Sequence, residues 1–196
     1  MTDKNLLFAQ RYRRPESILD GFRCKGCGLS AFSCKRVPGR GVWPAEVLFI
    51  GEAPGKTEDV LGEAFIGPSG KLLDHAFKDA VSMGGYSIPT YYITNVLACR
   101  PTDRLDGPNR EPTKEEVERC KGRLLLTVSR VQAKVVVLLG GIAQKSCKKM
   151  FPDTIALVHP SFILRKGGVT SSVYRAFVRG LTVVFQKAAE ERVKVR

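Results

Sequence analysis

A short apolar run at residues 47–50 ends abruptly in the turn sequence Gly51-Glu52-Ala53-Pro54-Gly55. Four consecutive apolar residues bounded by glycine and proline predict a buried strand. In an open α/β sheet, ligands bind in the crevice beyond the carboxyl ends of the strands. The pattern therefore predicts that the Glu52 carboxylate lies at the position where such a sheet does its chemistry.

Strand and helix patterns alternate along the rest of the chain. Apolar runs predict four strands, at residues 47–50, 91–96, 134–139 and 155–158. Amphipathic spacing and capping residues predict four helices, from Ser69 to Gly84, from Thr113 with a capping box at Glu116, from Gly141 toward Met150, and from Ser171 or Ser172 to about Glu191. This alternation predicts a three-layer α/β/α fold with a central, mostly parallel four-stranded sheet.

A length of 196 residues suits one domain with a sizeable core. We therefore expect a single domain over residues 1–196, with a short helix or an arm at residues 1–20. Residues 21–46 are rich in glycine, cysteine and basic residues. Such a composition predicts a loop segment that needs a crosslink to the rest of the domain.

The sequence from Gly51 to Thr57 superficially resembles a phosphate-binding P-loop. That motif has four residues between its glycines, whereas three separate Gly51 from Gly55 here. Pro54 also removes one of the backbone N–H groups that would bind a phosphate. We therefore expect neither a nucleoside triphosphatase nor a nucleotide cofactor.

The chain carries 32 lysines and arginines against 19 acidic residues, a formal net charge of +13. A charge of this size and sign favours a polyanionic partner, nucleic acid first. Basic residues also stand beside the turn motifs, at Lys56, Arg100, Arg104, Arg110, Arg165 and Lys166. The alternative is a basic surface that serves solubility alone.

No apolar stretch approaches the roughly 20 residues of a membrane span, and the first twenty residues contain no secretory signal. We therefore expect a cytoplasmic protein with no membrane partner. In a reducing compartment, the six cysteines are expected to bind metal or to be buried rather than to form disulfides.

Several motifs, in order, resemble the family 4 uracil-DNA glycosylases, the iron–sulfur members of that superfamily. They are residues 51–59 (GEAPGKTED), 62–73 (GEAFIGPSGKLL), 93–101 (ITNVLACRP), 135–140 and 158–161 (VHPS). The resemblance extends from about Cys24 to about Leu164. It implies excision of uracil from single- or double-stranded DNA, in base excision repair, by a monomer that flips the target nucleotide out of the helix.

The resemblance implies two catalytic residues. Breaking the C1′–N1 bond makes the sugar cation-like and the base anionic. Glu52 is the best candidate to stabilise the cation or to orient the attacking water. His159, before Pro160, would donate a hydrogen bond to uracil O2 as negative charge develops there. The alternative for a lone histidine is a structural role.

The remaining substrate contacts also follow from the resemblance. The Asn95 amide would pair with uracil O4 and N3–H, because it offers a donor and an acceptor together. Phe65 would stack on the flipped base, and Glu58 would exclude the methyl group of thymine at C5. Gly51 and Ala53 complete the predicted substrate-binding set. Their alternative roles are structural: a turn for Asn95, core packing for Phe65 and a helix-start acid for Glu58.

Five residues are predicted to bind DNA: Ser69, Arg100, Ser161, Arg165 and Lys166. Residues 164–168 (LRKGG) are predicted to form the wedge that enters the duplex and fills the vacated stack. A plain basic turn is the alternative interpretation of these residues.

Four cysteines match the family's 4Fe–4S ligands: Cys24, Cys27, Cys99 and Cys120. By spacing alone, a tetrahedral zinc site is equally satisfied, and iron–sulfur is preferred only through the resemblance. The cluster would be structural and would tie residues 21–46 to the sheet. Cys147 is expected in the core, and Cys34 remains a competing ligand.

One segment departs from the family. The loop at residues 100–112 is longer than expected, with residues 103–107 as the apparent insertion. A related subgroup crosslinks to DNA through a histidine near this position, but the two histidines here, His75 and His159, lie elsewhere, so we expect no covalent trapping.

Two rival functions remain: a glycosylase for a modified or other deaminated base, and a non-catalytic iron–sulfur DNA-binding module.

Overall fold

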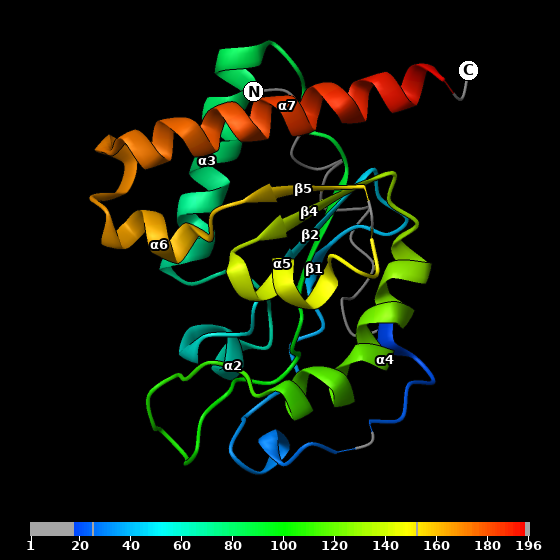
Figure 1. Ribbon diagram of the computed structural model, residues 1–196, viewed down its shortest axis with the longest axis vertical. Helices are drawn as coiled ribbons and strands as arrows, with labels where there is room; N and C mark the ends of the chain where they lie inside the picture. The colour runs from blue at the N-terminus through cyan, green and yellow to red at the C-terminus, as the bar shows by residue number, and fades with distance from the viewer. Residues whose placement is uncertain (1–17, 25, 152, 195–196) are drawn as a thin grey trace, which may run out of the picture.

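The computed structural model describes residues 18–24, 26–151 and 153–194, and Figure 1 shows its ribbon. The helix or arm expected at residues 1–20 lies outside these residues except for its last three. Strands and helices alternate from residue 40 onward. No helix in the described ranges is long and apolar enough to cross a membrane.

The central sheet has five strands in the order β1-β3-β2-β4-β5. The four predicted strands are confirmed as a parallel set: β2 (Val47–Gly51), β3 (Tyr91–Asn95), β4 (Val135–Leu139) and β5 (Thr154–Leu157). The prediction of four strands missed β1 (Arg40–Gly41), which pairs antiparallel with β3 at the edge. Two residues are too few to show a periodicity, so the sequence carries no signal for this strand.

Helices cover both faces of the sheet, so the predicted three layers are confirmed (Figure 1). On one face, Phe49 of β2 packs against Phe77 of α3 (Pro68–Gly84), which contacts Phe185 of α7 (Ser172–Val193), with ring centroids 5.2 and 5.7 Å apart. On the other face, Leu48 and Leu138 share a core with residues of α4 (Lys114–Val131) and α5 (Gly141–Cys147). Burial on both faces explains why β2 is apolar throughout.

Helix ends mostly follow the predicted caps. Thr113 and Glu116 form the predicted capping box of α4, and the Ser171 side chain caps α7. The prediction that Ser69 caps α3 is wrong, because the cap is Gly67 and Pro68 occupies the first turn. Proline is favoured there, since that N–H has no partner within the helix. Cys147 is buried in the core as expected.

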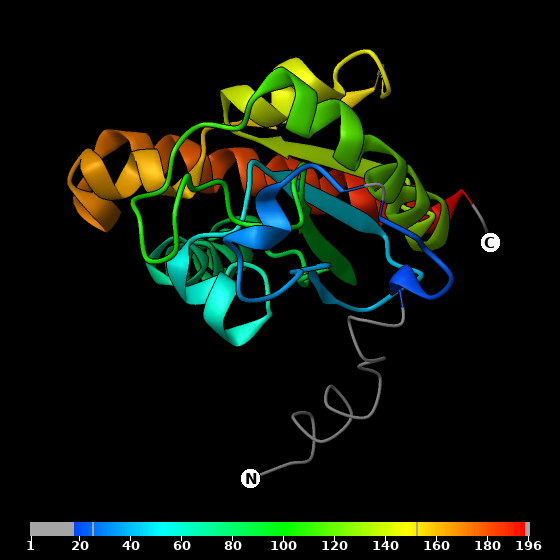
Figure 2. The same ribbon diagram turned by 90° about the horizontal axis from the view of Figure 1, so that it is seen from below.

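Two short α-helices, which the sequence pattern did not predict, lie at the carboxyl edge of the sheet. They are α2 (Lys56–Leu61) and α6 (Pro160–Arg165), and α6 continues into the 3-10 helix η3 (Gly168–Thr170). A further 3-10 turn, η2 (Leu29–Ala31), lies in the cysteine-containing segment. Helices of about six residues are too short to show an amphipathic repeat. Figure 2 shows that the loop after β3 and the α6–η3 segment project beyond the same edge of the sheet.

Candidate active site

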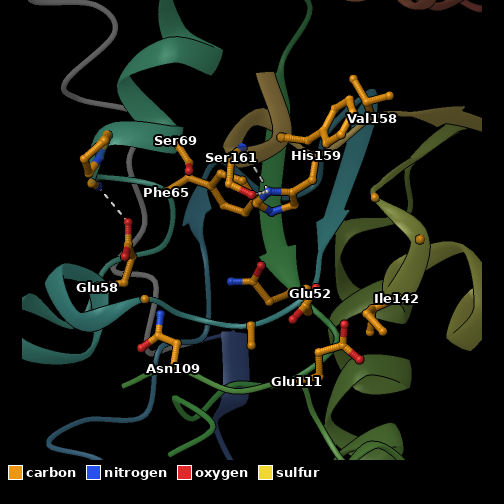
Figure 3. A pocket seen from close by; sticks show the side chains of 18 of the residues that line it. Glu52, Glu58, Phe65, Ser69, Asn109, Glu111, Ile142, Val158, His159 and Ser161 are labelled. Carbon is orange, nitrogen blue, oxygen red and sulfur yellow. Dashed lines mark hydrogen bonds between the residues drawn. The ribbon is translucent and has the colours of Figure 1, made fainter. Parts of the chain in front are cut away.

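A cavity of about 750 Å³ opens at the carboxyl ends of the strands (Figure 3). Its wall includes most of the predicted site: Glu52, Ala53, Glu58, Phe65, Ser69, Asn95, His159, Ser161 and Arg165. These residues come from four separate segments of the chain. The parallel sheet brings the segments together, because the carboxyl ends of its strands share one edge.

Asn95 is the last residue of β3 and lies opposite Gly51 in the sheet. Its side chain is 2 % exposed, and its Oδ1 has no hydrogen-bond partner among the described residues. A buried amide oxygen without a partner costs about 1–3 kcal/mol, so such atoms are rare unless a ligand satisfies them. The cavity therefore contains an acceptor suited to a ligand N–H group.

Gly51 makes space for two of its neighbours. A Cβ atom at this position would lie 2.5 Å from Asn95 Oδ1 and 2.6 Å from Phe65 Cζ. Any larger residue would displace both side chains from the cavity. The structure thus gives Gly51 a clear steric role, alongside the substrate contact predicted for it.

Phe65 is held in an unusual backbone conformation, with φ of 55°. The turn is fixed by Glu58, whose Oε1 accepts hydrogen bonds from the N–H groups of Ile66 (3.1 Å) and Gly67 (2.7 Å). The Phe65 ring lies 5.8 Å from the His159 ring, centroid to centroid. Glu58 therefore positions the aromatic wall of the cavity, a role that sequence reasoning did not assign to it.

His159 caps the start of α6. Its Nδ1 accepts a hydrogen bond from the Ser161 N–H at 3.2 Å, and Ser161 Oγ lies 2.8 Å from the same nitrogen (Figure 3). Burial, with a further contribution from Arg165, lowers the pKa of His159 to about 4. The ring is therefore neutral near pH 7, and an accepting Nδ1 assigns its proton to Nε2. His159 is prepared to donate one hydrogen bond without carrying a charge.

Glu52 directly follows β2, and Figure 3 shows its carboxylate beside that of Glu111 in the cavity. Burial raises the pKa of Glu52, the Glu111 charge raises it further, and Arg165 opposes the shift. A half-buried carboxylate near a second one retains protons more strongly than usual. Sequence reasoning missed Glu111 and its cavity neighbour Asn109, whose only signal was their place in the long loop.

The predicted DNA-binding residues divide into two groups. Ser69, Ser161 and Arg165 line the cavity, and Lys166 is exposed beside α6, with its Nζ 5.7 Å from the centre of the Phe162 ring. The prediction that Arg100 binds DNA has to be corrected, because Arg100 is only 4 % exposed.

The Arg100 guanidinium donates to Asn109 Oδ1 (2.5 Å) and to the Gly107 carbonyl. Both bonds lie within the loop that Arg100 begins. Arg100 therefore braces this loop from inside and does not reach the surface, as a phosphate contact would require. A sequence alone cannot distinguish a buried arginine from an exposed one.

The four predicted ligand cysteines line one small cavity on the α4 side of the molecule, together with Phe22, Leu29 and Leu97. Residues 21–46 and α4 meet there. Among the described residues, however, no group of three or more histidines, cysteines and acids is arranged to hold a single metal ion. The four thiols thus line the same cavity without forming such a group. Cys34 is exposed and does not line this cavity.

Arg123 connects the two sites and was not predicted. It is 1 % exposed and donates from Nη2 to the Asn95 and Val96 carbonyls and from Nη1 to Thr94 Oγ1, at 2.5, 2.6 and 2.9 Å. Its guanidinium also lies 3.8 Å from Cys120 Sγ. One buried arginine thus fixes the strand end that carries Asn95 and borders the cysteine cavity.

Comparisons with known proteins agree with this geometry. Residues 38–181 match the sequence profile of the uracil DNA glycosylase superfamily. The chain is also similar to type-4 uracil-DNA glycosylases, with 40 % identity over 128 residues for Archaeoglobus fulgidus, 38 % over 117 for Sulfurisphaera tokodaii and 34 % over 121 for Thermotoga maritima. The aligned parts cover 65, 60 and 62 % of this chain and 60, 50 and 58 % of those relatives. The predicted resemblance is confirmed, and the chain belongs to the uracil DNA glycosylase superfamily.

Proposed function

We propose that this protein is a DNA glycosylase that hydrolyses the N-glycosidic bond of uracil and leaves an abasic site for base excision repair. The buried, unpartnered Oδ1 of Asn95 carries the proposal. An acceptor in this position suits the N3–H of uracil, and the same amide can donate to O4. Cytosine offers the opposite pattern at these two atoms.

The walls of the cavity complete the recognition of a flipped base. Phe65 supplies an aromatic face for stacking, fixed in place by the bonds from Glu58 to the turn. Glu58 itself lines the cavity and remains our proposal for the group that excludes the methyl of thymine. Gly51 and Ala53 supply backbone close to the base, because no side chain at position 51 intervenes.

The chemistry assigns separate roles to His159 and Glu52. As the C1′–N1 bond breaks, its electrons pass to the base, and Nε2–H of neutral His159 donates to the developing charge on O2. The Glu52 carboxylate faces the sugar, where it stabilises the positive charge and orients water. The water oxygen bonds to C1′, its proton passes to Glu52, and uracil leaves as the anion.

DNA would approach along the edge of the sheet that carries the cavity. Arg165 and Lys166 are exposed there, within the predicted wedge at residues 164–168. Phosphate binding by these cations and by the net positive charge would make affinity fall steeply with salt. We also propose that the protein acts as a monomer.

We also propose a structural 4Fe–4S cluster held by Cys24, Cys27, Cys99 and Cys120. The four thiols line one cavity, and four thiolates are the ligand set that such a cluster uses. Such a group would supply crosslinks rather than chemistry. It would tie residues 21–46 to α4 and to the start of the long loop.

Labelled oligonucleotides test the proposed reaction. Single and double strands carrying uracil, thymine, cytosine or hypoxanthine are incubated without added metal and then treated with alkali to reveal abasic sites. We expect cleavage only at uracil, and its loss in Asn95→Ala. If another base were excised instead of uracil, that base would be the substrate and the proposal would be wrong. DNA binding without any cleavage would favour the non-catalytic alternative.

A further inference from the structure

The tip of the long loop (residues 100–112) presents an apolar side chain to solvent. Leu105 is 67 % exposed, more than any other leucine among the described residues. Its neighbours in sequence are Arg104 and Asp106, so an apolar group stands between two charges. The proposed function does not use this segment, which contains the insertion expected at residues 103–107.

The tip is braced rather than loose. The Arg104 carbonyl accepts hydrogen bonds from Thr102 Oγ1 (3.0 Å) and the Gly107 N–H (3.1 Å), which close a tight turn around Leu105. The buried Arg100 guanidinium holds the second half of the loop by hydrogen bonds to Gly107 and Asn109. A segment whose backbone is already fixed loses less conformational entropy when it binds a partner.

The charges of the tip are also arranged for an anionic partner. Asp103 pairs with Arg110 at 2.6 Å, and Asp106 pairs with Lys56 at 3.0 Å. Both carboxylates are thus compensated by cations of the protein itself. Arg104 makes no ion pair within the described part of the chain, so the tip presents Leu105 next to a cation available to a phosphate.

The loop forms one side of the active-site entrance. Asn109 and Glu111 of the loop line the cavity, as does Lys56, the partner of Asp106. Phe162 and Arg165 of α6 line it as well. Both segments project beyond the carboxyl edge of the sheet (Figures 1 and 2). DNA bound at the cavity would therefore meet the loop tip and the α6–η3 segment together.

We propose that Leu105 is a second wedge, which packs against the base stack of duplex DNA beside the flipped nucleotide while Arg104 binds a flanking phosphate. The inference rests on the proposed function. Opening a base pair and unstacking it costs a few kcal/mol, and an apolar side chain that fills the gap offsets part of that cost. This stabilisation by Leu105 applies only to DNA whose base stack has to be opened, that is, to duplex DNA.

Substrates that differ in the cost of opening test this role. Excision of uracil is measured for the wild type, Leu105→Ala and Leu105→Phe on a single strand, a duplex with U opposite G and a duplex with U opposite A. Leu125→Ala, which truncates a leucine of α4 that is 44 % exposed, serves as the matched control. Thermal unfolding confirms that all variants are folded.

We expect Leu105→Ala to lose about tenfold in kcat/KM on the U·A duplex, less on U·G, and less than about twofold on the single strand. Leu105→Phe should retain duplex activity, and Leu125→Ala should match the wild type on every substrate. Equal rates for Leu105→Ala and wild type, or an equal loss on all three substrates, would overturn the wedge while leaving the proposed function intact. Absence of uracil excision by the wild type on all three substrates would instead overturn the proposed function and this inference with it.

Discussion

The active-site cavity and the cysteine cavity are built in opposite ways. In the first, Asn95, Glu52 and His159 stand at strand ends of a packed sheet, and backbone hydrogen bonds fix Phe65 and His159. In the second, Cys24 and Cys27 lie in a segment with little regular structure. The fold alone thus positions the side chains of the first cavity, whereas the proposed cluster would have to supply the crosslinks of the cysteine region.

The difference shows what each site needs. Catalysis needs groups aimed before the substrate arrives, so the sheet supplies rigid positions and tolerates an unpaired amide there. A structural cluster needs only ligands that can come together, because its bonds order the chain afterwards. Arg123 is the exception that touches both regions, through Asn95 on one side and Cys120 on the other.

The largest expected effect on excision is that of His159→Ala. Loss of one preorganised donor to a developing negative charge typically costs about 10²–10³-fold in rate. Single-turnover excision of uracil measures the loss, and salt-dependent DNA binding should be unchanged. His75→Ala is the matched control, because the other histidine is exposed on α3, where it contacts Asp79 and Tyr174 rather than the active-site cavity. A His159→Ala enzyme of near-normal rate would contradict the donor role.

Arg123→Met tests the link between the two regions. The change leaves the Asn95 and Val96 carbonyls without their buried donor, which costs about 1–3 kcal/mol in stability for each unsatisfied group. We expect a lower melting temperature and about tenfold slower excision, because Asn95 loses its support. Lys121→Met, an exposed change on the same helix, should affect neither. A lower melting temperature without any change in excision would show that the two regions are not coupled.

Cysteine replacement tests whether crosslinks hold the second region. Cys99→Ala should lose bound iron, lower the melting temperature and increase proteolysis within residues 21–46, while single-strand excision at low temperature falls less than about threefold. Cys34→Ala should keep full iron content, because Cys34 lies outside the cavity. If Cys34→Ala lost iron and Cys99→Ala kept it, the ligand set would be wrong.

The smallest effect concerns pH. In the proposed mechanism Glu52 has to be ionised to act. Burial and Glu111 both raise its pKa, so excision should decline as the pH falls through a value above the ordinary 4.5. Glu111→Gln removes one of these causes and should move the acid limb to lower pH. His159, with a pKa of about 4, should add no limb near 6.5. An acid limb that stays in place or rises in Glu111→Gln would contradict the coupling.

Much of the fold could be predicted from the sequence, because local patterns specify its longer strands and helices. Apolar runs located the parallel strands, and capping residues located the starts of α4 and α7. The elements that escaped prediction were too short for a periodic signal, namely β1, α2 and α6. The candidate site was found through motifs at strand ends, where topology guarantees convergence.

Local sequence patterns set the alternation of strands and helices, the turn after β2, the basic character of the chain and the identity of the residues at the strand ends. The use of the polar side chains depends on the folded structure, because partners distant in sequence set their burial and hydrogen bonding. Arg100 and Arg123 became buried braces, Glu58 became the support of Phe65, and Glu111 came to lie beside Glu52. Residue type fixes what a side chain can do, and its neighbours in space decide which of those things it does.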